Sequence, residues 1–460
     1  MKNPVEILIS GLSLVRNPLG AALFGVKAVD GTYDPEVAQR EIRTAERRVY
    51  GPQGLARFEK EAGSELARLA RRSLAQYFAQ ESRIQNRWVA WIRSGGILLS
   101  LPLLFLCLVA GGLRRRGKEP CPADVAVLGH YDEFRKVVVP LFRGLRVAYC
   151  THMQPWLGAA ELAFLIRAIV VCPRVVLHPR LVLNLLRWLS YYAYVVRLHG
   201  PKKIVSFFEA VCSSSLITAY LRERAVEHIN HMHGERFPSA GISFCEFDEF
   251  DVWGRHFQEM FESQRCTARR FRITGNPYHR ELFKEKRRID QPRPKHLLIV
   301  HNQTLTPGSL PHTVLAELLS TLDGSWDVWF RLHYRERASG LACLAQLRQE
   351  ESLASGRVCI RLQEPSETRL SDALVASRVV VGLTSTAMVD AWVAGCKIIH
   401  LAGDIDRDVV MNRYGGSRNA IFARGDCEEI RAFLSHPAAI DEREDELVDY
   451  MTAVRAGTSV

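Results

Sequence analysis

The sequence lacks three glycine-containing motifs that identify large classes of enzyme. It contains no Walker-type phosphate loop, no Gly-x-Gly-x-x-Gly and no Gly-x-Ser-x-Gly. These motifs cradle nucleoside triphosphates, open dinucleotide-binding units and carry the nucleophile of α/β hydrolases, respectively. Their absence removes the best evidence for an NTPase, a dehydrogenase or a hydrolase.

Paired cysteines are also missing. Eleven cysteines are scattered along the chain, and no two of them form a Cys-x-x-Cys pair. An odd number of scattered cysteines in a large chain indicates a reducing compartment and structural thiols. Residues 1–28 lack the charged, apolar and small-residue order of a cleavable signal, so we expect no secretory signal.

Positive charge is what the chain has in excess. Its 460 residues carry a formal net charge of +11, and the pI is near 9.2. This charge indicates an anionic partner, or it is the plain basic character of many bacterial membrane-associated proteins. We see no RNA-recognition signature, zinc-finger spacing or lysine-rich tail, so we expect no nucleic-acid partner. Phosphorylated sugars and acidic lipid headgroups remain as candidates for the anionic partner.

An apolar segment in the first third of the chain points to a membrane. Residues 34–93 have a helical, amphipathic pattern, and the uncharged segment 95–113 follows, flanked by arginines and by two tryptophans on its N-terminal side. That segment is long enough to span a bilayer. Pro102 also fits a kinked monotopic segment, and a buried core helix is the third alternative. We predict a helical, membrane-associated extension over residues 1–120.

A second apolar and basic stretch covers residues 161–199, which have no acidic residue after Glu161. Four arginines alternate with leucine, valine and aromatic residues. Two interpretations stay open. A helix pair of this composition can lie on an anionic membrane surface. It can equally be a core hairpin whose arginines extend to solvent.

From residue 121 onward, short apolar strands alternate with helices. This alternation is typical of doubly wound parallel sheets. A charged, proline-rich linker at 285–294 divides it. We therefore predict two Rossmann-like domains that face a cleft, at residues 121–284 and 295–438, with a C-terminal helix in 439–460. At 460 residues the length also favours more than one domain.

One segment of the second domain predicts a phosphate site. Residues 379–399 have the order strand, hydroxyl-rich turn, helix, glycine and strand. Side chains of Thr384, Ser385 and Thr386 are suited to capping the helix, whose first N–H groups attract phosphate. Asp390, one helical turn further on, is placed to orient these hydroxyls or a ribose.

Further candidates follow other predicted strands of both domains, because ligands bind at the carboxyl ends of parallel strands. In the second domain these residues are Gln303, Thr304, His333 and Arg335. In the first domain, His233 or Glu235 can act as a general base, Arg236 can bind an anion, and Asn276 borders the cleft. The histidines near His233 have no recognised metal-ligand spacing, so we predict no metal.

Taken together, these residues resemble a bacterial glycosyltransferase of the GT-B type, over about residues 200–400. The second half resembles the donor domains of sialyltransferase-like and capsule-assembly transferases. In those proteins a His-Pro pair and a Ser/Thr pair at a helix start contact the donor nucleotide. His333, Ser385 and Thr386 match these positions, although Tyr334 replaces the proline. The turn at His233 resembles one in the acceptor half of capsule and teichoic-acid transferases.

The resemblance implies an inverting, metal-independent glycosyltransferase without a cofactor, at the cytoplasmic face of a bacterial inner membrane. Its partners would be a nucleotide-sugar donor, with a CMP-sugar favoured, a glycan or lipid-linked acceptor, and an anionic membrane surface. Such an enzyme would build capsule or lipopolysaccharide. The alternatives are a CDP-polyol phosphotransferase of the teichoic-acid type and a non-catalytic membrane scaffold for polysaccharide assembly.

Overall fold

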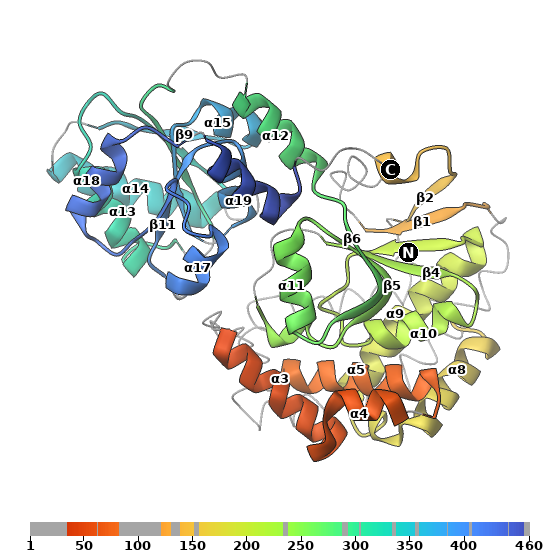
Figure 1. The fold of residues 1–460 in the computed structure, drawn as a ribbon. Helices are drawn as coiled ribbons and strands as arrows, with labels where there is room; N and C mark the ends of the chain where they lie inside the picture. Colours follow the sequence, from red (N-terminus) through yellow and green to blue (C-terminus); the bar gives the residue numbers. More distant parts are fainter. Residues whose placement is uncertain are drawn as a thin grey trace, which may run out of the picture.

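The protein folds into two lobes, each built on a parallel sheet (Figure 1). The computed structural model describes residues 35–61, 63–81, 121–129, 139–150, 156–232, 238–287, 293–302, 305–333, 337–354, 358–383, 385–403, 407–439 and 441–454. Two doubly wound α/β units are therefore confirmed. The domain boundaries themselves stay a prediction.

The N-terminal lobe has six parallel strands in the order β2-β1-β3-β4-β5-β6. Chain order reverses between β1 and β3, as in flavodoxin-like sheets. Apolar residues cover both faces, with Val125 and Val205 in one buried cluster and Ala126 and Ile204 in another, which suits a sheet that is buried on both sides. The strands are β1 (Val125–Leu128), β2 (Val147–Cys150), β3 (Lys203–Ser206), β4 (Glu227–His231), β5 (Glu246–Val252) and β6 (Thr267–Ile273).

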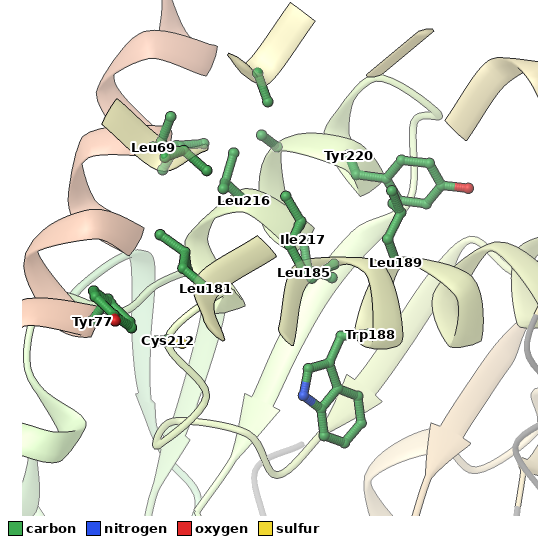
Figure 2. Close-up of a cluster of buried hydrophobic side chains, with 14 of the residues drawn as sticks. Leu69, Tyr77, Leu181, Leu185, Trp188, Leu189, Cys212, Leu216, Ile217 and Tyr220 are labelled. Carbon is green, nitrogen blue, oxygen red and sulfur yellow. The ribbon is translucent and has the colours of Figure 1, made fainter. Parts of the chain in front are cut away.

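Helices α9 and α10 pack against one face of this sheet, and α5 and α8 pack on these helices. Figure 2 shows Leu181 and Leu185 of α9 near Leu216 and Ile217 of α10, and Leu189 beside Tyr220, and all six side chains are buried. The helices of this lobe are α3 (Pro35–Tyr50), α4 (Gly54–Glu61), α5 (Glu65–Glu81), α8 (Ala159–Val171), α9 (Pro179–His199), α10 (Ser214–Arg222) and α11 (Arg255–Ser263), with short 3₁₀ turns η2 (Gly51–Gln53), η3 (Val139–Phe142), η4 (Pro173–Val175) and η5 (Ala240–Ile242).

The helical pattern predicted before residue 93 is borne out over α3 to α5, which join the core of the N-terminal lobe. Arg72 of α5 is fully buried, and its guanidinium donates to the Arg265 carbonyl and to the Thr267 hydroxyl. It also lies against Glu246 on β5, so α5 is tied to the sheet by charge as well as by packing. No helix in the described part of the chain combines the length and the apolar character that crossing a membrane requires. Residues 95–113 lie outside the described residues.

The C-terminal lobe has six parallel strands in the order β12-β11-β10-β7-β8-β9. The order reverses between β10 and β7, the Rossmann arrangement. Its strands are β7 (His296–Val300), β8 (Asp327–Arg331), β9 (Ile360–Gln363), β10 (Val379–Gly382), β11 (Lys397–Leu401) and β12 (Ala420–Ala423). Its helices are α13 (Leu310–Ser320), α14 (Arg337–Ala354), α15 (Leu370–Ala376), α16 (Thr386–Val393), α17 (Arg407–Arg413) and α18 (Cys427–Ser435).

Two helices join the lobes. Helix α12 (Pro277–Arg287) leaves β6 and packs on α15 and α16, whereas the last helix, α19 (Glu442–Thr452), returns to α11. The Tyr450 hydroxyl of α19 donates to Glu259 of α11. One buried apolar cluster runs from Phe250 and Trp253 of the N-terminal lobe to Trp392 and Met451.

One local expectation is corrected by the structure. The predicted linker begins as helix, because α12 continues to Arg287. The last strand, β12, is only four residues long. Ser213, before α10, forms no side-chain cap and instead donates to Asn184.

Gly254 makes the contact with α19 possible, because a Cβ there would lie 2.2 Å from the Met451 carbonyl oxygen. We expect Gly254→Ala to displace α19 and to lower the free energy of unfolding by about 1–3 kcal/mol or more, the usual cost of overpacking. Thermal unfolding measures this change. Gly63→Ala is the matched control, because nothing lies within 4 Å of that Cβ. Equal melting temperatures for the two variants would contradict the contact.

His228 on β4 is a fully buried histidine of the core. Its Nε2 lies 2.9 Å from the Tyr192 hydroxyl and 3.0 Å from the Ser206 hydroxyl, and its Nδ1 lies 2.7 Å from the Thr218 hydroxyl. Burial, helped by the charge of Arg222, lowers the pKa of His228 to about 3. The imidazole is therefore neutral in the folded state.

A pH dependence of stability follows from this shift. Between pH 6.5 and 3 the unfolded chain binds a proton at His228 and the folded chain does not, so stability is lost as the pH falls below about 6.5. We expect His228→Gln to reduce the slope of unfolding free energy against pH by up to about 1.4 kcal/mol per pH unit. Urea unfolding from pH 7 to pH 5 tests this, with the exposed His436→Gln as the control. An unchanged slope for His228→Gln would refute it.

Candidate functional site

The candidate site lies at the carboxyl ends of β7 and β10, where the strand order of the C-terminal sheet reverses. We call this the β7–β10 edge. Gly382 ends β10 and pairs with Val300, which ends β7. A Cβ at Gly382 would lie 3.1 Å from both the Val300 carbonyl oxygen and the Met388 sulfur. Glycine therefore lets α16 start close to the sheet, at the place where doubly wound folds bind their ligands.

Helix α16 begins at this edge with the predicted hydroxyl residues. Ser385 is its N-cap, and the Ser385 Oγ accepts a hydrogen bond of 3.3 Å from the backbone N–H of Ala387. Ser385 and Thr386 are half-buried, whereas the helix is buried from Ala387 onward. The start of α16 is thus the partly accessible end of a buried helix. The positive end of its helix dipole favours an anion there.

His301, the residue after β7, is the second polar group at this edge. It is 1% exposed, and neither ring nitrogen has a hydrogen-bond partner among the residues that the structure describes. Its ring packs on Phe330, with 5.7 Å between centroids, and Gly340 of α14 leaves room for it, since a Cβ there would lie 3.2 Å from Nδ1. A buried polar group without a partner calls for an explanation, and a bound ligand supplies one.

The protonation state of His301 follows from its surroundings. Burial lowers its pKa, and the nearby His333 lowers it further. A backbone interaction with Leu305 acts in the opposite direction and is outweighed. His301 is therefore neutral near pH 7, with one N–H donor and one acceptor nitrogen to offer.

The remaining donor-side predictions are placed as follows. His333 is half-buried, two residues beyond β8 and near His301. Four residues lie outside the described residues, namely Gln303, Thr304, Arg335 and Thr384. The structure thus brings Ser385, Thr386 and His333 to the same sheet edge, and it adds His301. In the sequence, His301 stands beside Gln303 and Thr304, but its burial was not visible there.

Asp390 requires a correction. The sequence placed its carboxylate beside the hydroxyls of the turn, one helical turn away. In the structure, the Asp390 carboxylate is buried and lies 2.7 Å from Nε2 of His279 on α12. The His279 ring is fully buried and meets Trp253 of the N-terminal lobe edge-on, with 5.0 Å between centroids. Asp390 therefore connects α16 to α12 instead of orienting the hydroxyls.

The Asn276 side chain also has a structural role. Its side-chain oxygen accepts a hydrogen bond of 3.0 Å from the backbone N–H of Tyr278, which starts α12. This is an Asx cap, so the side chain expected at the acceptor or cleft side stabilises the helix between the lobes. His233, Glu235 and Arg236 lie outside the described residues.

A histidine–carboxylate pair lies at the carboxyl edge of the N-terminal sheet. His231 ends β4, and its Nδ1 is 3.3 Å from Oδ2 of Asp251 on β5, the residue with which it is paired in register. Arg272 on β6 donates to the same carboxylate at 2.8 Å. Burial raises the pKa of Asp251, but hydrogen bonds from His231 and Arg272 outweigh it, so the pKa is lowered overall. Asp251 occurs in an acidic strand without a motif, so the sequence offers no signal for this pair.

Other features of the described chain lie elsewhere or are absent. No group of three or more His, Cys, Asp or Glu side chains that could hold a metal ion occurs in the described ranges. A cavity of about 640 Å³ lies near the start of β4, at the opposite edge of the N-terminal sheet, lined by Glu65, Arg222, Glu227, Asp248, Arg269 and Arg270 among others. It is therefore separate from the β7–β10 edge.

Comparison with known proteins gives no family. No family model and no curated protein matches the chain. Among solved structures, the Anabaena protein HepE in complex with UDP and glucose is 12% identical, with 73% of this chain and 96% of that chain covered and a TM-score of 0.42. The UDP-GlcNAc 2-epimerase of Neisseria meningitidis bound to UDP-GlcNAc is 11% identical (72% and 97% covered, TM-score 0.44), as is Acinetobacter baumannii MurG (73% and 95%, TM-score 0.41). Likenesses this distant assign neither family nor activity.

The pair of Asp390 and His279 can be tested by its coupling energy. We expect Asp390→Ala to lower the free energy of unfolding by about 1–3 kcal/mol, because it leaves the buried Nε2 of His279 without a partner. Adding His279→Ala should cost less than the sum of the two single changes. Urea unfolding of the three variants measures the cycle. Strict additivity would show that the two side chains do not interact.

Proposed function

We propose that this protein is a glycosyltransferase that moves a sugar from a nucleotide-activated donor to a cell-surface glycan or a lipid-linked acceptor. We favour a CMP-sugar donor, transfer with inversion and without a metal, and a role in capsule or lipopolysaccharide synthesis at the cytoplasmic face of a bacterial inner membrane. The observation that carries the proposal is the β7–β10 edge, where the start of α16 and the unpartnered His301 occur together.

The chemistry of transfer explains why these groups suit the donor. When the bond between the sugar C1 and the phosphate oxygen breaks, negative charge grows on the leaving phosphate. The positive end of the α16 helix dipole would stabilise that charge without having to reorganise. Neutral His301 would donate its N–H to the nucleotide part of the donor, and His333 would bind beside it.

The acceptor hydroxyl needs a base, and the N-terminal lobe offers candidates. Asp251 can only accept a hydrogen bond when ionised, so Nδ1 of His231 carries the proton and Nε2 is the basic nitrogen. His231 can then take the proton of the acceptor hydroxyl while its oxygen attacks C1 from the face opposite the phosphate. His233 and Glu235, which follow β4, remain the alternatives that the sequence favours.

The experiment combines a nucleotide screen with variants of the β7–β10 edge. We expect CMP, CDP or UDP to raise the melting temperature of the protein. His301→Phe should keep the melting temperature of the free protein within about 2 °C, since no hydrogen bond is lost, and it should weaken nucleotide binding about tenfold, the equivalent of one hydrogen bond. Calorimetric titration measures the affinity.

Ser385→Ala provides a second probe with a matched control. It should cost about 1 kcal/mol of stability through the lost cap and weaken nucleotide binding as well. Ser64→Ala removes a cap of the same kind, because the Ser64 Oγ accepts from Ala67 in the N-terminal lobe, and it should leave binding unchanged. If none of the three nucleotides binds, the scaffold interpretation replaces the enzyme. Product that gains phosphorus would instead indicate polyol-phosphate transfer.

A further inference from the structure

Helix α8 and the turn after it expose apolar side chains. Exposed fractions are 60% for Ile166, 69% for Val170, 48% for Val176 and 70% for Leu177. Eight large hydrophobic side chains are exposed in the described part of the chain, and these four fall within twelve residues. We call Ile166, Val170, Val176 and Leu177 the α8 face. Such clustering marks an interaction surface more strongly than scattered apolar residues do.

The opposite side of α8 already packs on the protein, so the α8 face is a second apolar surface. Phe164 and Ala168 are fully buried toward α5 and α10. Glu161, the only acidic residue of the helix, is also directed inward, where it accepts from the Tyr220 hydroxyl and from Arg224, both at 2.8 Å. A helix at a solvated surface normally has a polar outer side. The outer side of α8 has only one charged residue, Arg167.

Positive charges border the α8 face. Arg174, in the turn, is exposed, and its Nη2 donates to the Arg48 carbonyl of α3 at 3.1 Å. Both guanidinium groups lie over the Phe78 ring, at 4.1 Å for Arg48 and 6.0 Å for Arg174. Neither has a carboxylate partner among the described residues, and no acidic residue occurs in the sequence between Glu161 and Glu209.

The pKa of the neighbouring His178 is consistent with positive charge on Arg48 and Arg174 that no carboxylate in the described ranges neutralises. Burial lowers the pKa of His178, and the charges of Arg48 and Arg174 lower it further. Figure 1 shows α8 beside α5, on one side of the N-terminal lobe. Helix α9, by contrast, is largely buried, so of the two interpretations of residues 161–199, α9 is core and only α8 with its turn offers a surface.

We propose that the α8 face, with Arg48 and Arg174, docks on an anionic lipid bilayer. The apolar side chains would enter the boundary between headgroups and acyl chains, and the two arginines would bind lipid phosphates. Charge decides between this partner and a second copy of the chain. Two α8 faces packed together would bring like charges against each other, whereas an anionic bilayer complements them. The inference rests on the proposed function, which includes a membrane location, and deepens it by naming the contacting residues.

The test uses the full chain and flotation with phosphatidylcholine vesicles, with and without phosphatidylglycerol. We expect Leu177→Asp and Val170→Asp each to weaken binding to anionic vesicles at least tenfold, without changing the melting temperature, because both side chains are exposed. Leu310→Asp is the matched control, since Leu310 is 58% exposed on α13 of the other lobe. It should bind as the unchanged protein does. Arg174→Glu should remove only the preference for anionic vesicles.

Each alternative outcome overturns the proposal. Equal vesicle binding by all variants would mean that another part of the chain holds the membrane. A dimer in size-exclusion chromatography that Leu177→Asp dissociates would mean that a second copy covers the α8 face.

Nucleotide affinity, measured on the same variants, should stay unchanged. Loss of vesicle binding with intact nucleotide binding therefore separates this proposal from the proposed function, and each can fail alone.

Discussion

The arrangement of the candidate site depends on one buried hydrogen bond, between His279 of α12 and Asp390 of α16. Asp390 lies one turn from the start of α16, and His279 packs on Trp253 at the end of β5. The helix whose N-terminus forms the candidate phosphate site is therefore connected, through two side chains, to the sheet edge of the other lobe. Gly254 adds a backbone contact with α19 at the same junction. Reorientation of the lobes would have to disturb this junction, so the two lobes are mechanically linked.

Some buried polar side chains have hydrogen-bond partners among the described residues, and others have none there. The first kind stabilises the fold, whereas the second kind indicates a ligand site. His228 has partners for both ring nitrogens, and Arg72 is bonded on several sides, so both stabilise the fold. His301 is as deeply buried as His228, but neither of its ring nitrogens is bonded within the described chain. A fold gains nothing from such a histidine, since an unbonded buried polar group costs free energy. This contrast is the physical basis for placing a ligand at the β7–β10 edge.

Much of the architecture could be predicted from local pattern. Valine-rich strands such as β10, the Ser385 cap of α16 and the alternation of strands and helices are encoded within short windows of sequence. What could not be predicted involves longer distances. Asp390 was assigned to its own turn because its partner, His279, lies 111 residues away. Asp251 had no signal, because only strand register places it beside His231.

By itself, the sequence determined the two α/β units, the turn that starts α16 and an excess of positive charge. Each of these depends on residues close together in the chain or on composition alone. Only the tertiary structure decided which polar side chains are bonded, which helix of residues 161–199 is core and which exposes an apolar face. The reason is physical. Periodicity shows that a helix has an apolar side, but a helix apolar on both sides, such as α8, gives no hint of which side the protein itself covers.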